Sequence, residues 1–270
     1  MQRNGASEPS SNGYEPALAE YGRASRSPLH ILAFLLPLII VYEVGLALRH
    51  EELASIGGVR AWVMLASFME TLGVSPSTVV GYSLPAAVIV VVLLLWHTLE
   101  RRRWQLRPSV VLLMFAEAVA WMVPLLLFGS VLERIGQQPP PRAPQPLAST
   151  ALDALDQVSW QARLVIALGA GLYEELLFRM ALLALLHAIL ADLCNLGPKI
   201  VLSASLLVSA AAFTLYHDIW TPTGPDYLAV LLYFVGGIYL GAIYLLRGFG
   251  VAVGAHACYN TTVLVLLGPA

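Results

Sequence analysis

Residues 169–179 read Gly169-Ala170-Gly171-Leu172-Tyr173-Glu174-Glu175-Leu176-Leu177-Phe178-Arg179, with two adjacent glutamates and one arginine inside a long apolar segment. Such a segment is typical of a helix that crosses a membrane. Each charged side chain at the centre of a bilayer costs about 2.5–3.5 kcal/mol. We therefore expect these charges to have partners or a function, and the rest of the chain to supply the partners.

The composition of the chain is that of an integral membrane protein with several spans. Hydrophobic residues make up 58% of its 270 residues and charged residues 12%, whereas soluble domains have about 25% charged residues. The net charge of −2 gives no basic face for a nucleic acid. Two cysteines, Cys194 and Cys258, are too few for a disulfide framework or a cysteine-rich metal site, so we expect free thiols. The predicted fold is an all-α, polytopic transmembrane helix bundle with about seven spans plus interfacial helices.

Changes in composition divide the chain into four parts. Residues 1–28 are polar and predict a disordered cytoplasmic tail. Residues 29–135 are expected to hold N-terminal transmembrane helices, residues 136–158 a proline-rich linker and a short amphipathic helix, and residues 159–270 a second membrane domain. Residues 61–72 are too few to span a bilayer and suit an interfacial helix. The expected spans cover residues 29–48, 79–99, 109–132, 160–193, 200–217, 227–246 and 251–267.

Basic residues orient these spans. The cluster from Arg101 to Arg107 is the strongest short basic loop, and the positive-inside rule places it in the cytoplasm. Counting back through two spans puts the N-terminus in the cytoplasm as well. The use of one Lys against fourteen Arg leans towards a bacterial protein of the inner (plasma) membrane. On this topology His217 falls near the outer side, away from Glu174, and the sequence leaves that conflict open.

Helix geometry separates the two glutamates. Neighbouring side chains differ by about 100° around the axis, so Glu174 and Glu175 cannot face the same group. Glu175 and Arg179 share a face at i,i+4 and are expected to form an ion pair. Glu174 points away from that pair. It is therefore the glutamate that we expect to act as a general base. The alternative is that both glutamates only join helices.

Two histidines and an asparagine are the expected partners of Glu174. His217 ends one apolar helix, and His256 and Asn260 project from one face of another at i,i+4. A carboxylate and an imidazole that converge on a water can activate it for attack on a carbonyl, and donors nearby can stabilise the oxyanion. The same Glu174, His217 and His256 could instead hold zinc. The chain has no HExxH motif, and no serine or cysteine lies beside a histidine in a nucleophile context.

Three motifs in this order resemble the CPBP family of intramembrane proteases, also called the Abi or CAAX-protease family, which includes the Rce1-type prenyl-protein endopeptidases. The motif EExxxR is matched by Glu174, Glu175 and Arg179. FxxxH is matched by Phe213 and His217, and HxxxN by His256 and Asn260. The resemblance covers about residues 160–268, so that residues 159–270 are expected to be a CPBP-like catalytic membrane domain.

The resemblance implies a role for each matched position. Glu174 would activate the water with help from His217, His256 and Asn260 would stabilise the oxyanion, and Glu175, Arg179 and Phe213 would support the site. It implies a glutamic-type endopeptidase that cuts a membrane-associated protein or peptide, works in the lipid bilayer and requires no cofactor. Zinc, which would make it a metalloprotease, is not favoured. The alternative is a non-catalytic immunity or scaffold factor, or a proton-relay transporter.

Overall fold

The computed structural model describes residues 14–55, 60–71, 73, 79–101, 103–136, 158–222 and 224–268. These residues are almost entirely helical, as the sequence predicts. In chain order the elements are α1 (Tyr14–Ser25), α2 (Pro28–Ser55), α3 (Arg60–Thr71), α4 (Val79–Leu99), α5 (Pro108–Gly136), α7 (Trp160–Glu175), α8 (Leu182–His187), α9 (Pro198–Tyr216), α10 (Tyr227–Arg247) and α11 (Phe249–Thr261). Three π-helical segments continue these helices: η2 (Leu176–Ala181), η3 (Ala188–Leu193) and η4 (Thr262–Leu266). A two-residue hairpin, β1 (Trp220–Thr221) and β2 (Gly224–Pro225), precedes α10.

Six helices in the described residues are long and apolar enough to cross a membrane. They are Pro28–Ser55, Pro108–Gly136, Trp160–Leu193, Pro198–Tyr216, Tyr227–Arg247 and Phe249–Leu266. The chain is therefore an integral, multi-pass membrane protein with an all-α fold. The seventh expected span, residues 79–99, coincides with α4, of which Ala86–Leu99 counts as a shorter apolar helix. The expected interfacial segment is the 12-residue helix α3.

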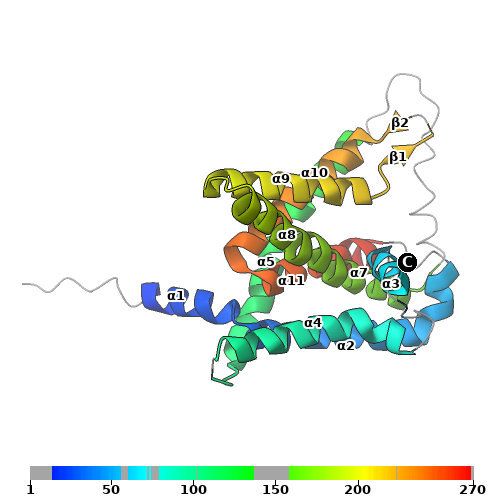
Figure 1. The fold of residues 1–270 in the computed structure, drawn as a ribbon. Helices are drawn as coiled ribbons and strands as arrows, with labels where there is room; N and C mark the ends of the chain where they lie inside the picture. Colours follow the sequence, from blue (N-terminus) through cyan, green and yellow to red (C-terminus); the bar gives the residue numbers. More distant parts are fainter. Residues whose placement is uncertain are drawn as a thin grey trace, which may run out of the picture.

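The helices cross the molecule in layers (Figure 1). Helix α4 lies along α2 on one side, α9 and α10 pack together on the other, and α7 and α11 pass between them. Helix α11 packs most extensively on α5 and α7. Small residues permit this: a Cβ atom added at Gly171 would lie 2.8 Å from the Cβ atom of Ala257. The glycines that the sequence places on these spans thus allow close helix approach.

The N-terminal segment is more ordered than the sequence predicts. The disordered tail expected over residues 1–28 is wrong from Tyr14 onward, because α1 forms there; residues 1–13 lie outside the described residues. Tyr21 on α1 donates a 2.6 Å hydrogen bond to Glu117 Oε2, and the same oxygen accepts one of 2.9 Å from Arg247. These long-range contacts dock α1 against α5 and the end of α10. The polar composition of the segment does not predict them. The expected linker and amphipathic helix fall almost wholly on residues 137–157, outside the described part of the chain.

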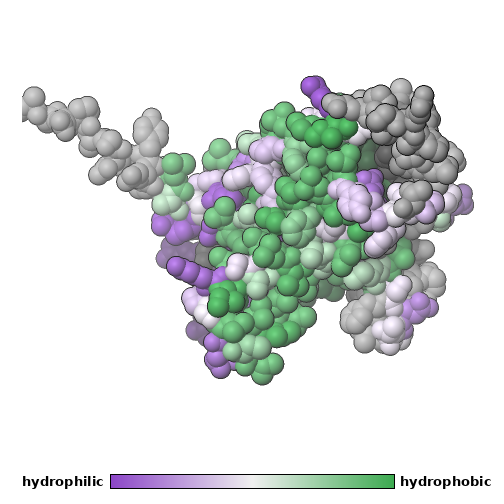
Figure 2. Space-filling model, turned by 90° about the horizontal axis from the view of Figure 1, so that it is seen from above, coloured by the Kyte–Doolittle hydropathy of each residue, from purple (hydrophilic) through white to green (hydrophobic). Residues whose placement is uncertain are grey.

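The exposed surface of the spans is apolar, as expected for helices that face lipid. Figure 2 shows hydrophobic side chains over the middle of one face, with hydrophilic ones towards its periphery, including the end where α1 lies. Many large apolar side chains on the spans are exposed, among them Leu112 at 70% and Leu127 at 61% on α5. In water such a surface would be unfavourable, whereas a bilayer solvates it.

Candidate active site

The two adjacent glutamates lie where an α-helix changes to a π-helix. Helix α7 ends at Glu175, and η2 carries Arg179. Single π-helical turns inside α-helices are frequent at functional sites. The side chains of Glu174, Glu175 and Arg179 are buried, the last two completely. Because all three charges are enclosed by protein, each must find its partner inside the bundle.

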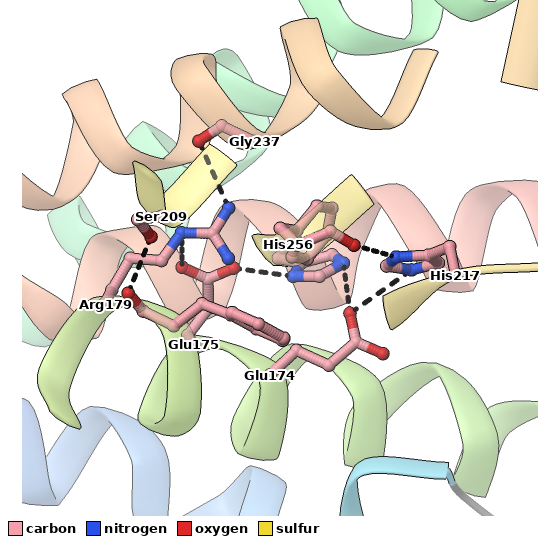
Figure 3. A network of polar contacts seen from close by, with 9 residues as sticks. Glu174, Glu175, Arg179, Ser209, His217, Gly237 and His256 are labelled. Carbon is pink, nitrogen blue, oxygen red and sulfur yellow. Dashed lines mark hydrogen bonds and ion pairs between the residues drawn. The ribbon is translucent and has the colours of Figure 1, made fainter. Parts of the chain in front are cut away.

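Glu175 lies between two positively polarised groups. Its Oε2 atom is 3.2 Å from Arg179 Nε, which confirms the expected i,i+4 ion pair. Its Oε1 atom is 2.8 Å from His256 Nδ1 on α11 (Figure 3). Arg179 also donates to the carbonyl oxygen of Gly237 at 3.3 Å and lies over the ring of Phe213. Glu175 therefore does more than neutralise Arg179, since it also holds His256.

His217 is oriented from both sides of its ring. Its Nδ1 atom is 2.7 Å from the carbonyl oxygen of Phe213, four residues earlier. Because a carbonyl oxygen can only accept a hydrogen bond, Nδ1 carries a proton and Nε2 is the acceptor of the neutral ring. Tyr233 on α10 stacks on the imidazole, with ring centroids 3.9 Å apart and planes 21° from parallel. This leaves His217 Nε2 facing Glu174 Oε2 at 3.7 Å.

His256 presents its second nitrogen to the same carboxylate oxygen. Glu175 accepts from Nδ1, so Nε2 is the acceptor of the neutral ring, and it lies 3.8 Å from Glu174 Oε2. Three acceptors from three helices thus face one another (Figure 3). Facing acceptors need a hydrogen donor or a cation between them, or a proton on one of them. Such an arrangement is suited to holding and deprotonating a water.

The conflict over the depth of His217 has a simple geometric solution. Glu174 precedes the end of η3 at Leu193 by 19 residues, and His217 follows the start of α9 at Pro198 by 19 residues. The two helices are joined by a four-residue turn, so both side chains lie at a similar distance from it. The two residues fall at different depths only if each span crosses the bilayer straight, and the helix from Trp160 to Leu193, at 34 residues, is much longer than a bilayer requires.

Asn260 and the supporting residues lie around the cluster of Glu174, His217 and His256 rather than within it. Asn260 is half-buried one turn after His256 on α11, and no hydrogen bond joins its amide to this cluster in the described part of the chain. Phe213 packs edge-on against Phe178, with ring centroids 5.4 Å apart. Ser209 donates a 2.8 Å hydrogen bond to the carbonyl oxygen of Phe178. Sequence reasoning missed Tyr233, since no spacing ties it to His217.

The distances in this cluster can be compared with those of a tetrahedral zinc site. A tetrahedral zinc ion with bonds of 2.0–2.1 Å holds its ligand atoms about 3.4 Å apart. The histidine nitrogens instead lie 3.7 and 3.8 Å from Glu174 Oε2. No group of three or more His, Cys, Asp or Glu in the described residues is placed to hold a metal ion.

Comparison with known families agrees with this part of the fold. Residues 156–262 match the model of a family described as Type II CAAX prenyl endopeptidase Rce1-like. This region is similar to the Rce1-like peptidases of the CPBP family, and we call it the Rce1-like domain. The resemblance indicated by the three motifs is thereby confirmed, and the Rce1-like domain contains all seven residues of the candidate site. The family is one of peptidases of the CAAX type. No curated protein and no solved structure gives a significant match to the chain.

Proposed function

We propose that the protein is an intramembrane endopeptidase that hydrolyses a peptide bond of a membrane-associated protein or peptide. The observation that carries this proposal is the convergence of Glu174 Oε2 with the Nε2 atoms of His217 and His256 at 3.7 and 3.8 Å. One water with hydrogen bonds of about 2.8 Å spans such a separation. The match of residues 156–262 to a peptidase family makes hydrolysis the chemistry to test first.

In this mechanism Glu174 is the general base. The attacking water donates one hydrogen bond to Glu174 and one to His217 Nε2, which aims its lone pair at the scissile carbonyl carbon. As the carbon–oxygen bond forms, Glu174 takes a proton from the water and later gives it to the amine that leaves. His217 keeps its orientation because Phe213 holds its Nδ1–H and Tyr233 holds its ring plane.

The oxyanion that forms on the carbonyl needs a donor. In this scheme His256 is the first donor, from Nε2 when that nitrogen carries a proton, while Glu175 at 2.8 Å from Nδ1 holds the ring in place. Asn260, one turn further along α11, is the second donor in this scheme, which requires its side chain to turn towards bound substrate. Stabilisation by preorganised donors in a low-dielectric site is a large part of such catalysis.

The proposal is tested with the Glu174→Gln variant. The amide keeps the size of the side chain but cannot accept the proton of the water, so we expect cleavage to fall by at least about 100-fold. Membrane proteomes of cells with the wild type or the variant are compared for new protein termini, and purified protein is then assayed on the substrate found. The matched control is Glu70→Gln, an exposed glutamate on α3.

The outcomes separate the alternatives. Full cleavage by Glu174→Gln, in a protein that inserts and unfolds like the wild type, would overturn the glutamic mechanism. A proton-relay transporter would instead move protons in proteoliposomes and create no new termini. Loss of activity on dialysis against a chelator, with recovery on addition of zinc, would favour the zinc alternative.

A further inference from the structure

A cleft of about 270 Å³ lies at the end of the bundle that holds α1, away from the motifs of the Rce1-like domain. Helix α1, the start of α2, the end of α4 and the turn before α5 form its walls. Its polar lining is mostly basic or amide-bearing: Arg23, Arg103, Arg107, His30, His97, Gln105, with Ser27 and one carboxylate, Glu20. All of these residues precede the region that matches the family model.

His97 is the most deeply buried of the polar residues that line this cleft. Its side chain is only 2% exposed, and neither ring nitrogen has a hydrogen-bond partner among the described residues. Its ring instead packs edge-on against Trp104, with centroids 4.4 Å apart. Buried polar groups in native proteins nearly always have a partner. An imidazole that lines a cleft and lacks one is therefore suited to a ligand with an acceptor atom.

Two of the basic groups are already used by the fold. Arg107 forms an ion pair with Glu20, and its guanidinium lowers the pKa of that carboxyl through hydrogen bonding and charge. The backbone N–H group of Arg107 donates to His30 Nε2 at 3.2 Å, while His30 Nδ1 is 2.6 Å from Ser27 Oγ. This leaves the exposed guanidinium groups of two other residues for a ligand.

Those two residues are Arg103 and Arg23, whose charge also acts on Glu20; neither forms an ion pair within 4.0 Å with another described residue. Guanidinium groups bind phosphate through paired, charge-assisted hydrogen bonds. The cleft also adjoins exposed apolar side chains: Trp104 is 62% exposed and Leu99 is 81% exposed. Aromatic and apolar side chains of this kind beside the ends of spans are typical of the membrane–water interface.

We propose that this cleft binds the phosphate group of an anionic phospholipid. Arg23 and Arg103 pair with the phosphate oxygens, and His97 donates a hydrogen bond from the wall of the cleft. The acyl chains lie outside, against the apolar surface that includes Leu99. Basic pockets between transmembrane helices commonly hold lipid head groups. Since the cleft joins α1 to α2, α4 and the turn before α5, bound lipid would stabilise the docking of α1.

The test measures lipid binding to the full-length protein in neutral detergent by native mass spectrometry. Phosphatidylglycerol is titrated into the wild type, Arg103→Ala and the double variant Arg23→Ala/Arg103→Ala. The control is Arg134→Ala, an exposed arginine near the end of α5 that does not line the cleft. Each interfacial arginine contributes about fivefold to binding of an anionic lipid, so we expect about 25-fold weaker binding in the double variant. His97→Phe, which keeps an aromatic ring against Trp104, should also weaken binding.

Two further ligands identify the source of the phosphate. Phosphatidylcholine carries a phosphate but no net charge, and we expect it to bind more weakly than phosphatidylglycerol. Inorganic phosphate should raise the thermal unfolding temperature less than the anionic lipid does. The proposal is overturned if the double variant binds phosphatidylglycerol as the wild type does, or if Arg134→Ala weakens binding equally. Equal stabilisation by inorganic phosphate alone would overturn the assignment to a lipid. Because both arginines are exposed, these variants test the cleft even if His97→Phe fails to fold.

Discussion

Replacement of Glu175 by glutamine should destabilise the protein strongly. In the wild type the carboxylate of Glu175 is the nearest counter-charge of Arg179, at 3.2 Å, and both side chains are fully buried. Glutamine keeps an oxygen that can accept from His256 Nδ1, but it removes the negative charge. Arg179 would then retain the carbonyl of Gly237 and the ring of Phe213 as its close partners.

The size of the effect follows from this burial. Removal of one partner of a buried ion pair costs about 3–5 kcal/mol, because the remaining charge is uncompensated. For a protein of this size that corresponds to a fall of about 6–20 °C in the melting temperature. A surface ion pair would give less than about 1 kcal/mol. The pair Arg49–Glu52, whose side chains are 39% and 25% exposed, supplies that comparison through Arg49→Gln, which leaves the hydrogen bonds from Ser159 to Glu52 in place.

Thermal unfolding in detergent, followed by intrinsic fluorescence, measures the change. The double variant Glu175→Gln/Arg179→Met tests its cause, because it removes the uncompensated charge together with the carboxylate. We expect the double variant to recover at least half of the lost melting temperature. A single variant as stable as the wild type would refute the reasoning, and so would a double variant less stable than the single one.

Two other predictions concern packing. Alanine at Gly171 would place its Cβ atom 2.9 Å from the backbone nitrogen of Ala257, which cannot move aside. Gly171→Ala should therefore lower the free energy of unfolding by about 1–3 kcal/mol. The control in the same unfolding assay is Gly236→Ala, whose Cβ atom meets only a leucine methyl group at 3.6 Å. Tyr233→Ala should lower the turnover number by up to about 100-fold with little change in KM, because the ring of His217 is no longer held by stacking. Tyr233→Phe should retain activity. Equal loss in both variants would show that the hydroxyl group matters rather than the stacking.

Much of the site follows from helical periodicity and from the cost of burying charge. The pairing of Glu175 with Arg179 required only the i,i+4 rule and a helix. The convergence of Glu174, His217 and His256 was expected because separate unsatisfied groups on three spans would be costly. The presence of the six long apolar helices followed from hydropathy. Local sequence carries the information for the ion pair and the spans, whereas the convergence was inferred from the cost of burial.

Other features depend on contacts that local spacing does not encode. The order of α1 rests on Tyr21 and Glu117, which are 96 residues apart in the chain. The stacking of Tyr233 on His217 depends on the rotation of α10 against α9, which sequence periodicity leaves free. The relative depth of Glu174 and His217 stayed open because hydropathy gives the presence of a span, while its tilt and length depend on packing. The position of the Asn260 side chain relative to substrate remains a prediction.

The two glutamates are not independent, because His256 joins them. The helix turns Glu174 and Glu175 towards different partners, yet one imidazole meets both, with Nδ1 on Glu175 and Nε2 facing Glu174. The Glu175 carboxylate holds Nδ1 of this ring, so that Nε2 stays directed at Glu174. Arg179 in turn holds Glu175 from the far side, with its Nε atom 3.2 Å from Glu175 Oε2. The arginine thus contributes to the geometry around Glu174 without touching it. In Arg179→Met the turnover number of cleavage should therefore fall together with the stability.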